Sequence, residues 1–136
     1  MDILRYFMAI CEEDQNGNTV YPLYFINNSL EEIEVLMFIK PRAMEKLKSI
    51  KKIEDIKDDF IDSVCVRKCV GIPSKSYIRD TIFFDWDFDW SNERWIWIRA
   101  PGGEEHLHFY MERYFIAFNK EVDFIPVLNR KGWIVL

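Results

Sequence analysis

The stretch ILRYFMAICEEDQNGNTVYPLYFIN, residues 3–27, predicts a β-hairpin at the start of the chain. Its two halves, 3–11 and 19–27, are rich in aromatic and β-branched residues, which favour strands. Between them lies Asn16-Gly17, a pair that readily adopts the positive φ angles of a two-residue hairpin turn. Pro22 has no amide donor, so we expect the second strand to lie at a sheet edge or to bulge there.

Strand patterns continue beyond this hairpin. Residues 28–40 predict a turn at 27-NNS-29 and then a strand that ends before Pro41, although the spacing of Ser29 and Glu32 also fits a helix start. The segments 63–70 and 76–84, separated by a turn at 71–75, predict a second hairpin. The final segment, 126–136, predicts a turn at 129–132 followed by a short strand.

Residues 94–100 (RWIWIRA) predict a strand that ends at 101-PGG-103. Because successive side chains of a strand point to opposite faces, Trp95, Trp97 and Arg99 share one face. Ile96 and Ile98 share the other face, which we expect to be buried.

Two segments have helical spacing. Within 41–60, apolar residues recur every three or four positions and predict a helix over about 42–59. The segment 104–118 fits a helix by the spacing of Leu107, Tyr110, Met111 and Tyr114. However, Leu107, Phe109 and Met111 also alternate as in a strand. We predict the helix and keep the strand as the alternative. The expected fold is α+β, a mainly antiparallel twisted sheet or small β-sandwich with one or two helices, in a single domain over 1–136.

The composition narrows the classes of function. The chain has 136 residues and a net charge of −5, so it lacks the basic footprint of a nucleic-acid binder. No apolar run is long enough to span a membrane, and the N-terminus does not resemble a secretory signal. Three cysteines without C-x-x-C spacing indicate a reducing compartment, which predicts a cytoplasmic protein. The aromatic share of 16% exceeds what a small core holds, so some aromatic side chains should lie at a surface.

The segment 84-FDWDFDWSNERWIWIR-99 is the strongest candidate for a functional site. As a strand, it would bury Trp86, Phe88 and Trp90 and display Asp85, Asp87 and Asp89 on the opposite face, with Glu93 nearby. The aspartates match the first positions of a calcium loop, but Trp90 and Ile96 stand where that loop needs glycine and glutamate, so we expect no metal. Three like charges in a row are costly unless a cationic partner offsets them. We therefore expect a protein-binding surface formed by Asp85, Asp87, Asp89, Glu93, Trp95 and Trp97.

Catalytic signals are weak in this sequence. It contains no G-x-S-x-G, no glycine-rich phosphate loop and no H-E-x-x-H, so we expect no enzyme and no cofactor. One alternative is a metal-dependent or acid/base enzyme in which His106, His108 and a carboxylate converge. Another is a carbohydrate or small-ligand module in which Trp95 and Trp97 are exposed side by side.

The segments 24-YFINNS-29, 83-FFDWDFDW-90 and 126-PVLNRKGWIVL-136, in this order, resemble small β-rich bacterial immunity proteins. Immunity proteins are the cytoplasmic antidotes of interbacterial toxins. The resemblance implies a non-catalytic protein that binds one toxin domain and blocks its active site. If that toxin has a basic cleft, the carboxylates of this chain would take the place of phosphates.

Overall fold

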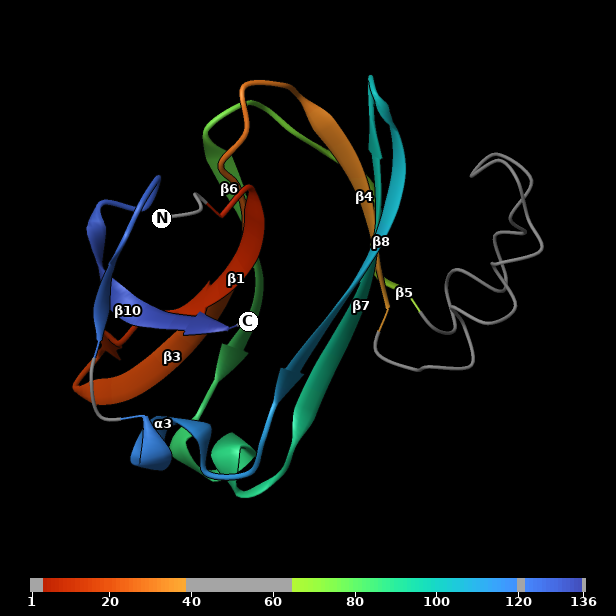
Figure 1. Cartoon of the computed structure of the whole chain (residues 1–136). Coiled ribbons are helices and arrows are strands. Elements are labelled where there is room, and N and C mark those ends of the chain that lie inside the picture. Colours follow the sequence, from red (N-terminus) through yellow and green to blue (C-terminus); the bar gives the residue numbers. More distant parts are fainter. Residues whose placement is uncertain (1–3, 39–64, 120–121, 136) are drawn as a thin grey trace.

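The computed structural model describes residues 4–38, 65–119 and 122–135, and most of them lie in antiparallel β-strands of two sheets (Figure 1). The first sheet consists of β1 (Tyr6–Ile10), β2 (Glu13–Gln15), β3 (Asn18–Asn27), β6 (Ser76–Phe83), β9 (Asp123–Ile125) and β10 (Arg130–Val135). The second has the order β5 (Cys65–Ile72), β4 (Ile33–Phe38), β7 (Asn92–Ala100), β8 (Gly103–Met111). The predicted β-rich, antiparallel architecture is confirmed. The predicted helix over 42–59 lies outside the described residues.

The opening hairpin forms as predicted. Asn16 and Gly17 both have positive φ, 52° and 84°, and join β2 to β3. β1 then pairs with the second half of β3, with Ile10 opposite Leu23. The prediction of an edge at Pro22 is wrong, because β6 pairs with β3 there, with Pro22 opposite Ile82. The predicted alternative was a bulge at Pro22, and the irregularity in this pairing lies just after it, where the register shifts between Leu23 and Tyr24.

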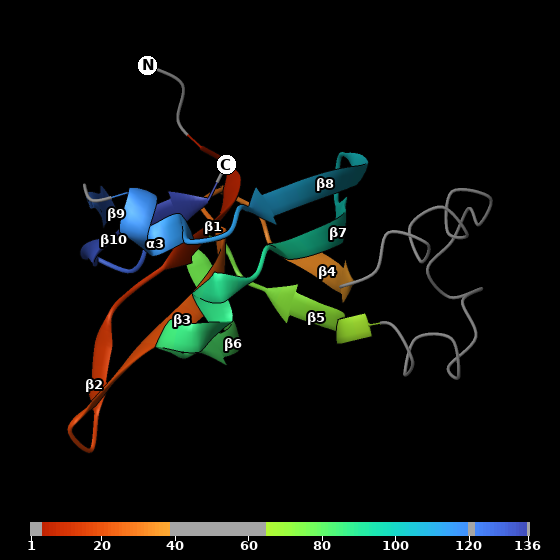
Figure 2. The ribbon, with the colours of Figure 1, turned by 90° about the horizontal axis from the view of Figure 1, so that it is seen from below.

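The predicted second hairpin is wrong, although both of its strands exist. β5 pairs with β4 in the second sheet, whereas β6 pairs with β3 in the first. The turn after Ile72, where Lys75 has a φ of 53°, therefore carries the chain from one sheet to the other. Figure 2 shows the two strands diverging on either side of this corner.

The main core lies between the facing sides of the two sheets. Met8, Ile10 and Phe25 of the first sheet belong to the same buried cluster as Val35 and Ile98 of the second. Alternate positions of the first sheet, among them Phe7, Ala9 and Ile26, belong to a second cluster that includes Ile125 and packs against Val127 and Leu128. Both faces of β1 and β3 are therefore buried, which explains their nearly continuous apolar sequences.

Two buried polar groups tie the sheets together. Asn27 is fully buried, and its Nδ2 donates to the carbonyl oxygens of Glu31, Ile72 and Pro73 at 2.8, 3.1 and 3.0 Å. In β7, Arg94 donates through Nε to Oδ2 of Asp80 in β6 at 2.8 Å, with the side chains 8% and 0% exposed. These contacts link β3 to the corner after β5, and β6 to β7.

The predicted helix over 104–118 is wrong, and the strand alternative is confirmed for its first half. β8 pairs with β7 along nine residues, from Ala100 opposite Gly103 to Asn92 opposite Met111. Only Phe115–Phe118 forms a single helical turn, α3. The apolar spacing of this segment reflects a strand followed by a compact turn.

Candidate acidic and aromatic binding surface

The acidic segment is not a strand. Asp85–Asp89 forms a short 3-10 helix, η2, between β6 and β7. The Asp87 carboxylate accepts a hydrogen bond from the amide of Phe84 at 2.8 Å, and the amide of Asp87 donates to the carbonyl of Phe84 at 3.0 Å. Aspartate side chains bond to nearby backbone amides more readily in such turns than in strands.

The aspartates consequently do not form the predicted row on one face. A 3-10 helix has three residues per turn, so positions two apart point in different directions. This arrangement relieves the like-charge repulsion that a strand would impose. Asp85 and Asp89 remain exposed, whereas Asp87 is half-buried and caps the turn.

The expected burial of the three aromatic side chains of this segment is correct for one of them. Phe88 is 6% exposed and contacts Tyr21 and Phe83 edge-to-face, at centroid distances of 5.3 and 5.5 Å. Trp86 and Trp90 are 64% and 69% exposed. Phe88 therefore anchors a turn that presents two tryptophans to solvent.

A second turn lies against η2. The amide of Tyr114 donates to the carbonyl of Phe88 at 2.6 Å, and Nε of Arg113 donates to the carbonyl of Asp89 at 3.0 Å. Tyr114 has a φ of 59°, which is unusual for a bulky residue. Together these segments close one end of the molecule, at the bottom of Figure 1.

The closed end combines acidic and aromatic side chains, and we call it the acidic–aromatic end. It contains the exposed carboxylates of Asp85 and Asp89 and the exposed rings of Phe84, Trp86, Trp90, Tyr114 and Phe118. Phe84 stacks on Trp86 at 4.9 Å, and Tyr114 meets Phe118 edge-to-face at 6.1 Å. Sequence reasoning missed Phe84, Tyr114 and Phe118 as exposed residues of this end; the excess of aromatic residues was the only signal that pointed to a surface.

A cavity of about 240 Å³ opens at this end. Its lining includes Asp85 and Asp89, the rings of Tyr21, Phe88 and Tyr114, and Ile116. Burial raises the pKa of the Tyr21 hydroxyl, and the nearby Asp85 carboxylate raises that pKa further. The cavity thus combines aromatic walls with two carboxylates.

Glu93, Trp95 and Trp97 lie on a different surface, the side of β7 that faces away from the core. Trp95 stacks on His108 at 4.7 Å, and Trp97 stacks on His106 at 5.1 Å. Because Trp97 is only 1% exposed, it cannot form the exposed tryptophan pair that a carbohydrate platform requires. The structure therefore divides the six predicted site residues between the end and this face.

The two histidines do not converge with carboxylates into a metal centre. Nε2 of His108 lies 3.1 Å from Oε2 of Glu93, and Oε2 of Glu104 accepts from Nε1 of Trp97 at 2.8 Å. Across the described ranges, no group of three or more His, Cys, Asp or Glu side chains could hold a metal ion. None of the helices in those ranges is long and apolar enough to cross a bilayer.

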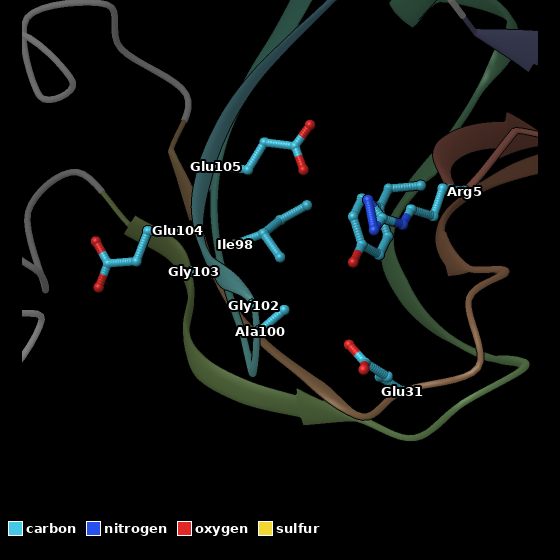
Figure 3. A pocket seen from close by; sticks show the side chains of 9 residues that line it. Arg5, Glu31, Ile98, Ala100, Gly102, Gly103, Glu104 and Glu105 are labelled. Carbon is cyan, nitrogen blue, oxygen red and sulfur yellow. The ribbon is translucent and has the colours of Figure 1, made fainter.

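A second cavity, of about 160 Å³, lies at the opposite end, between the start of β1 and the β7–β8 turn. Figure 3 shows Glu105 and Ile98 pointing into it toward Arg5, while Glu104 points to the other side of β8. Its lining carries charges of both signs, from Arg5, Glu31 and Glu105. Among the residues that the structure describes, the lining of the cavity at the acidic–aromatic end contains Asp85 and Asp89 but no lysine or arginine. We therefore place the candidate site at that end.

No protein-family model, no curated protein and no solved structure matches this chain.

Proposed function

We propose that this protein is a non-catalytic cytoplasmic inhibitor that binds a cationic protein, in the manner of an immunity protein that neutralises a bacterial toxin. The observation that carries the proposal is the exposure of Trp86 and Trp90 beside the exposed carboxylates of Asp85 and Asp89 on a turn held by buried Phe88. Tryptophan is enriched among the residues that dominate binding energy at protein interfaces.

Charge supports the choice of a cationic partner. The chain carries a net charge of −5, and Asp85 and Asp89 lie beside the exposed aromatic rings. An acidic surface accelerates association with a basic one and disfavours acidic partners. The resemblance to immunity proteins points to the same class of partner.

The preformed geometry of the surface supports tight binding. Hydrogen bonds from Phe84 to Asp87 and from Tyr114 to Phe88 hold both turns in place before any partner arrives. A surface that is already ordered loses less conformational entropy on association.

The test is calorimetric titration of the purified protein against the protein encoded immediately upstream of its gene, which we expect to be a cationic toxin domain. We expect Trp86→Ala and Trp90→Ala each to weaken binding by at least about 30-fold, the size of an interface hot spot. The matched control is Leu30→Ala, an 85% exposed apolar residue in the β3–β4 connection at the opposite end. Absence of wild-type binding, or full affinity in both tryptophan variants, contradicts the proposal.

Charge reversal at Asp85 and Asp89 is a second test of the same surface. Asp85→Lys and Asp89→Lys should lower the association rate and its dependence on salt, because they remove electrostatic steering. Asp87 is unsuitable for this test, because its carboxylate caps η2.

A further inference from the structure

We propose that the cavity at the acidic–aromatic end, between η2 and the 113–117 turn, receives one arginine side chain of the partner. This inference rests on the proposed function and identifies the partner group that this site recognises. The cavity is lined by Asp85, Asp89, Tyr21, Phe88 and Tyr114, and its volume is about 240 Å³. Pockets for drug-sized ligands begin at about 300 Å³, so this one suits a single side chain.

The chemistry of the lining selects a planar cation. Two carboxylates attract positive charge, and a carboxylate forms paired hydrogen bonds with the guanidinium fork. The rings of Tyr21, Phe88 and Tyr114 provide flat apolar walls, on which a guanidinium group stacks more readily than a strongly hydrated ammonium group.

The Tyr21 ring forms a fixed wall of this cavity. It is held edge-to-face against buried Phe88 at 5.3 Å. The Asp85 carboxylate in the same lining is exposed, and a carboxylate accepts several hydrogen bonds, so Asp85 offers acceptor positions to a cation.

The chain's own Arg113 shows that the Tyr114 ring, which lines the cavity, can face a guanidinium group. Its Cζ lies 5.3 Å from the centroid of the Tyr114 ring, while Nη2 donates to the Tyr114 hydroxyl at 3.3 Å and Nε donates to the Asp89 carbonyl at 3.0 Å. Arg113 does not line the cavity and leaves it open. An incoming arginine would make the same kinds of contact from the cavity side.

The experiment is an NMR titration of the full chain with Nα-acetyl-arginine amide and with the neutral isostere Nα-acetyl-citrulline amide. We expect saturable amide shifts in residues 84–90 and 113–117 with the arginine probe, and no saturation with citrulline at the same concentrations. The double variant Asp85→Asn and Asp89→Asn should lose the response. Asparagine keeps the size and shape of the aspartate side chain, and unchanged shifts elsewhere in the spectrum would confirm that the variant is folded.

The inference is overturned by no saturable response to arginine, by an equal response to citrulline, or by an undiminished response in the double variant. Binding of Nα-acetyl-lysine amide as tight as that of the arginine probe also overturns it, because the assignment depends on the guanidinium plane. Its failure is distinguishable from failure of the proposed function. If the probe does not bind but Trp86→Ala still abolishes toxin binding, only the arginine pocket is wrong.

Discussion

Replacing Phe88 with alanine should lower the stability of the fold strongly, whereas replacing Trp86 with alanine should leave it nearly unchanged. Phe88 is 6% exposed, so truncation to alanine removes nearly all of a buried aromatic side chain. Aromatic side chains bury about 150–250 Å² each, which corresponds to about 4–6 kcal/mol at about 25 cal/mol per Å². Phe→Ala substitutions in cores cost about 3–5 kcal/mol, so we expect Phe88→Ala to cost about 4 kcal/mol.

Trp86→Ala should change stability by less than about 1 kcal/mol, because the side chain is 64% exposed and the only ring contact found among the described residues is its stack on Phe84. Urea unfolding, followed by circular dichroism, measures both effects. For an m value of about 2 kcal/mol/M, Phe88→Ala should lower the midpoint by about 2 M.

The same measurement tests the conformation of η2. A strand would place Trp86, Phe88 and Trp90 on one buried face, so all three alanine variants would lose several kcal/mol. A 3-10 helix predicts that only Phe88→Ala does so. A loss above about 2 kcal/mol for Trp86→Ala, or none for Phe88→Ala, would refute this reasoning.

Two further predictions concern charged groups. Arg94→Met removes a donor to the buried Asp80 carboxylate and should cost about 3–5 kcal/mol in urea unfolding. Arg99→Met removes the ion pair with Glu34, whose side chain is 42% exposed, and should cost at most about 1 kcal/mol. Equal losses in the two variants would contradict the buried ion pair. The hydrogen bond from Arg130 lowers the pKa of the Glu13 carboxyl below its ordinary value of 4.5, so this carboxylate stabilises the fold fully above that value and progressively less as pH falls through its lowered pKa. Glu13→Gln should therefore reduce stability at pH 7 and flatten the loss below pH 4.5, and an unchanged acid profile would refute this role.

Strand positions in the described residues were largely predictable from the sequence because they depend on local signals. Alternation of apolar residues places β4 and β7, and the Asn16-Gly17 turn places the opening hairpin. The 104–118 segment failed because its apolar residues fit two periods at once. The pairing with β7 along nine residues decided in favour of the strand.

The candidate site was predictable in sequence but not in geometry. The 85–93 segment contains Asp85 and Asp89 of the candidate surface, yet the expected strand buried Trp86 and Trp90 and aligned the three aspartates. The hydrogen bond from the Phe84 amide to the Asp87 carboxylate stabilises a 3-10 helix instead of a strand. The packing of Phe88 against Tyr21 and Phe83 decides which side of this helix faces the core. Tyr21 lies in β3, far from η2 in the sequence, whereas Phe83 lies at the end of β6, directly before η2.

The sequence by itself determined where strands and turns form within the described residues, because backbone propensity and alternation act over a few neighbouring residues. Only the tertiary structure decided that β5 and β6 separate into different sheets, that Trp97 is buried and that Trp86 and Trp90 are exposed. These outcomes depend on contacts between residues distant in the chain, such as Arg94 with Asp80 and Tyr21 with Phe88. Local periodicity shows that a residue can face a core, but the packing of the two sheets decides which side becomes that core.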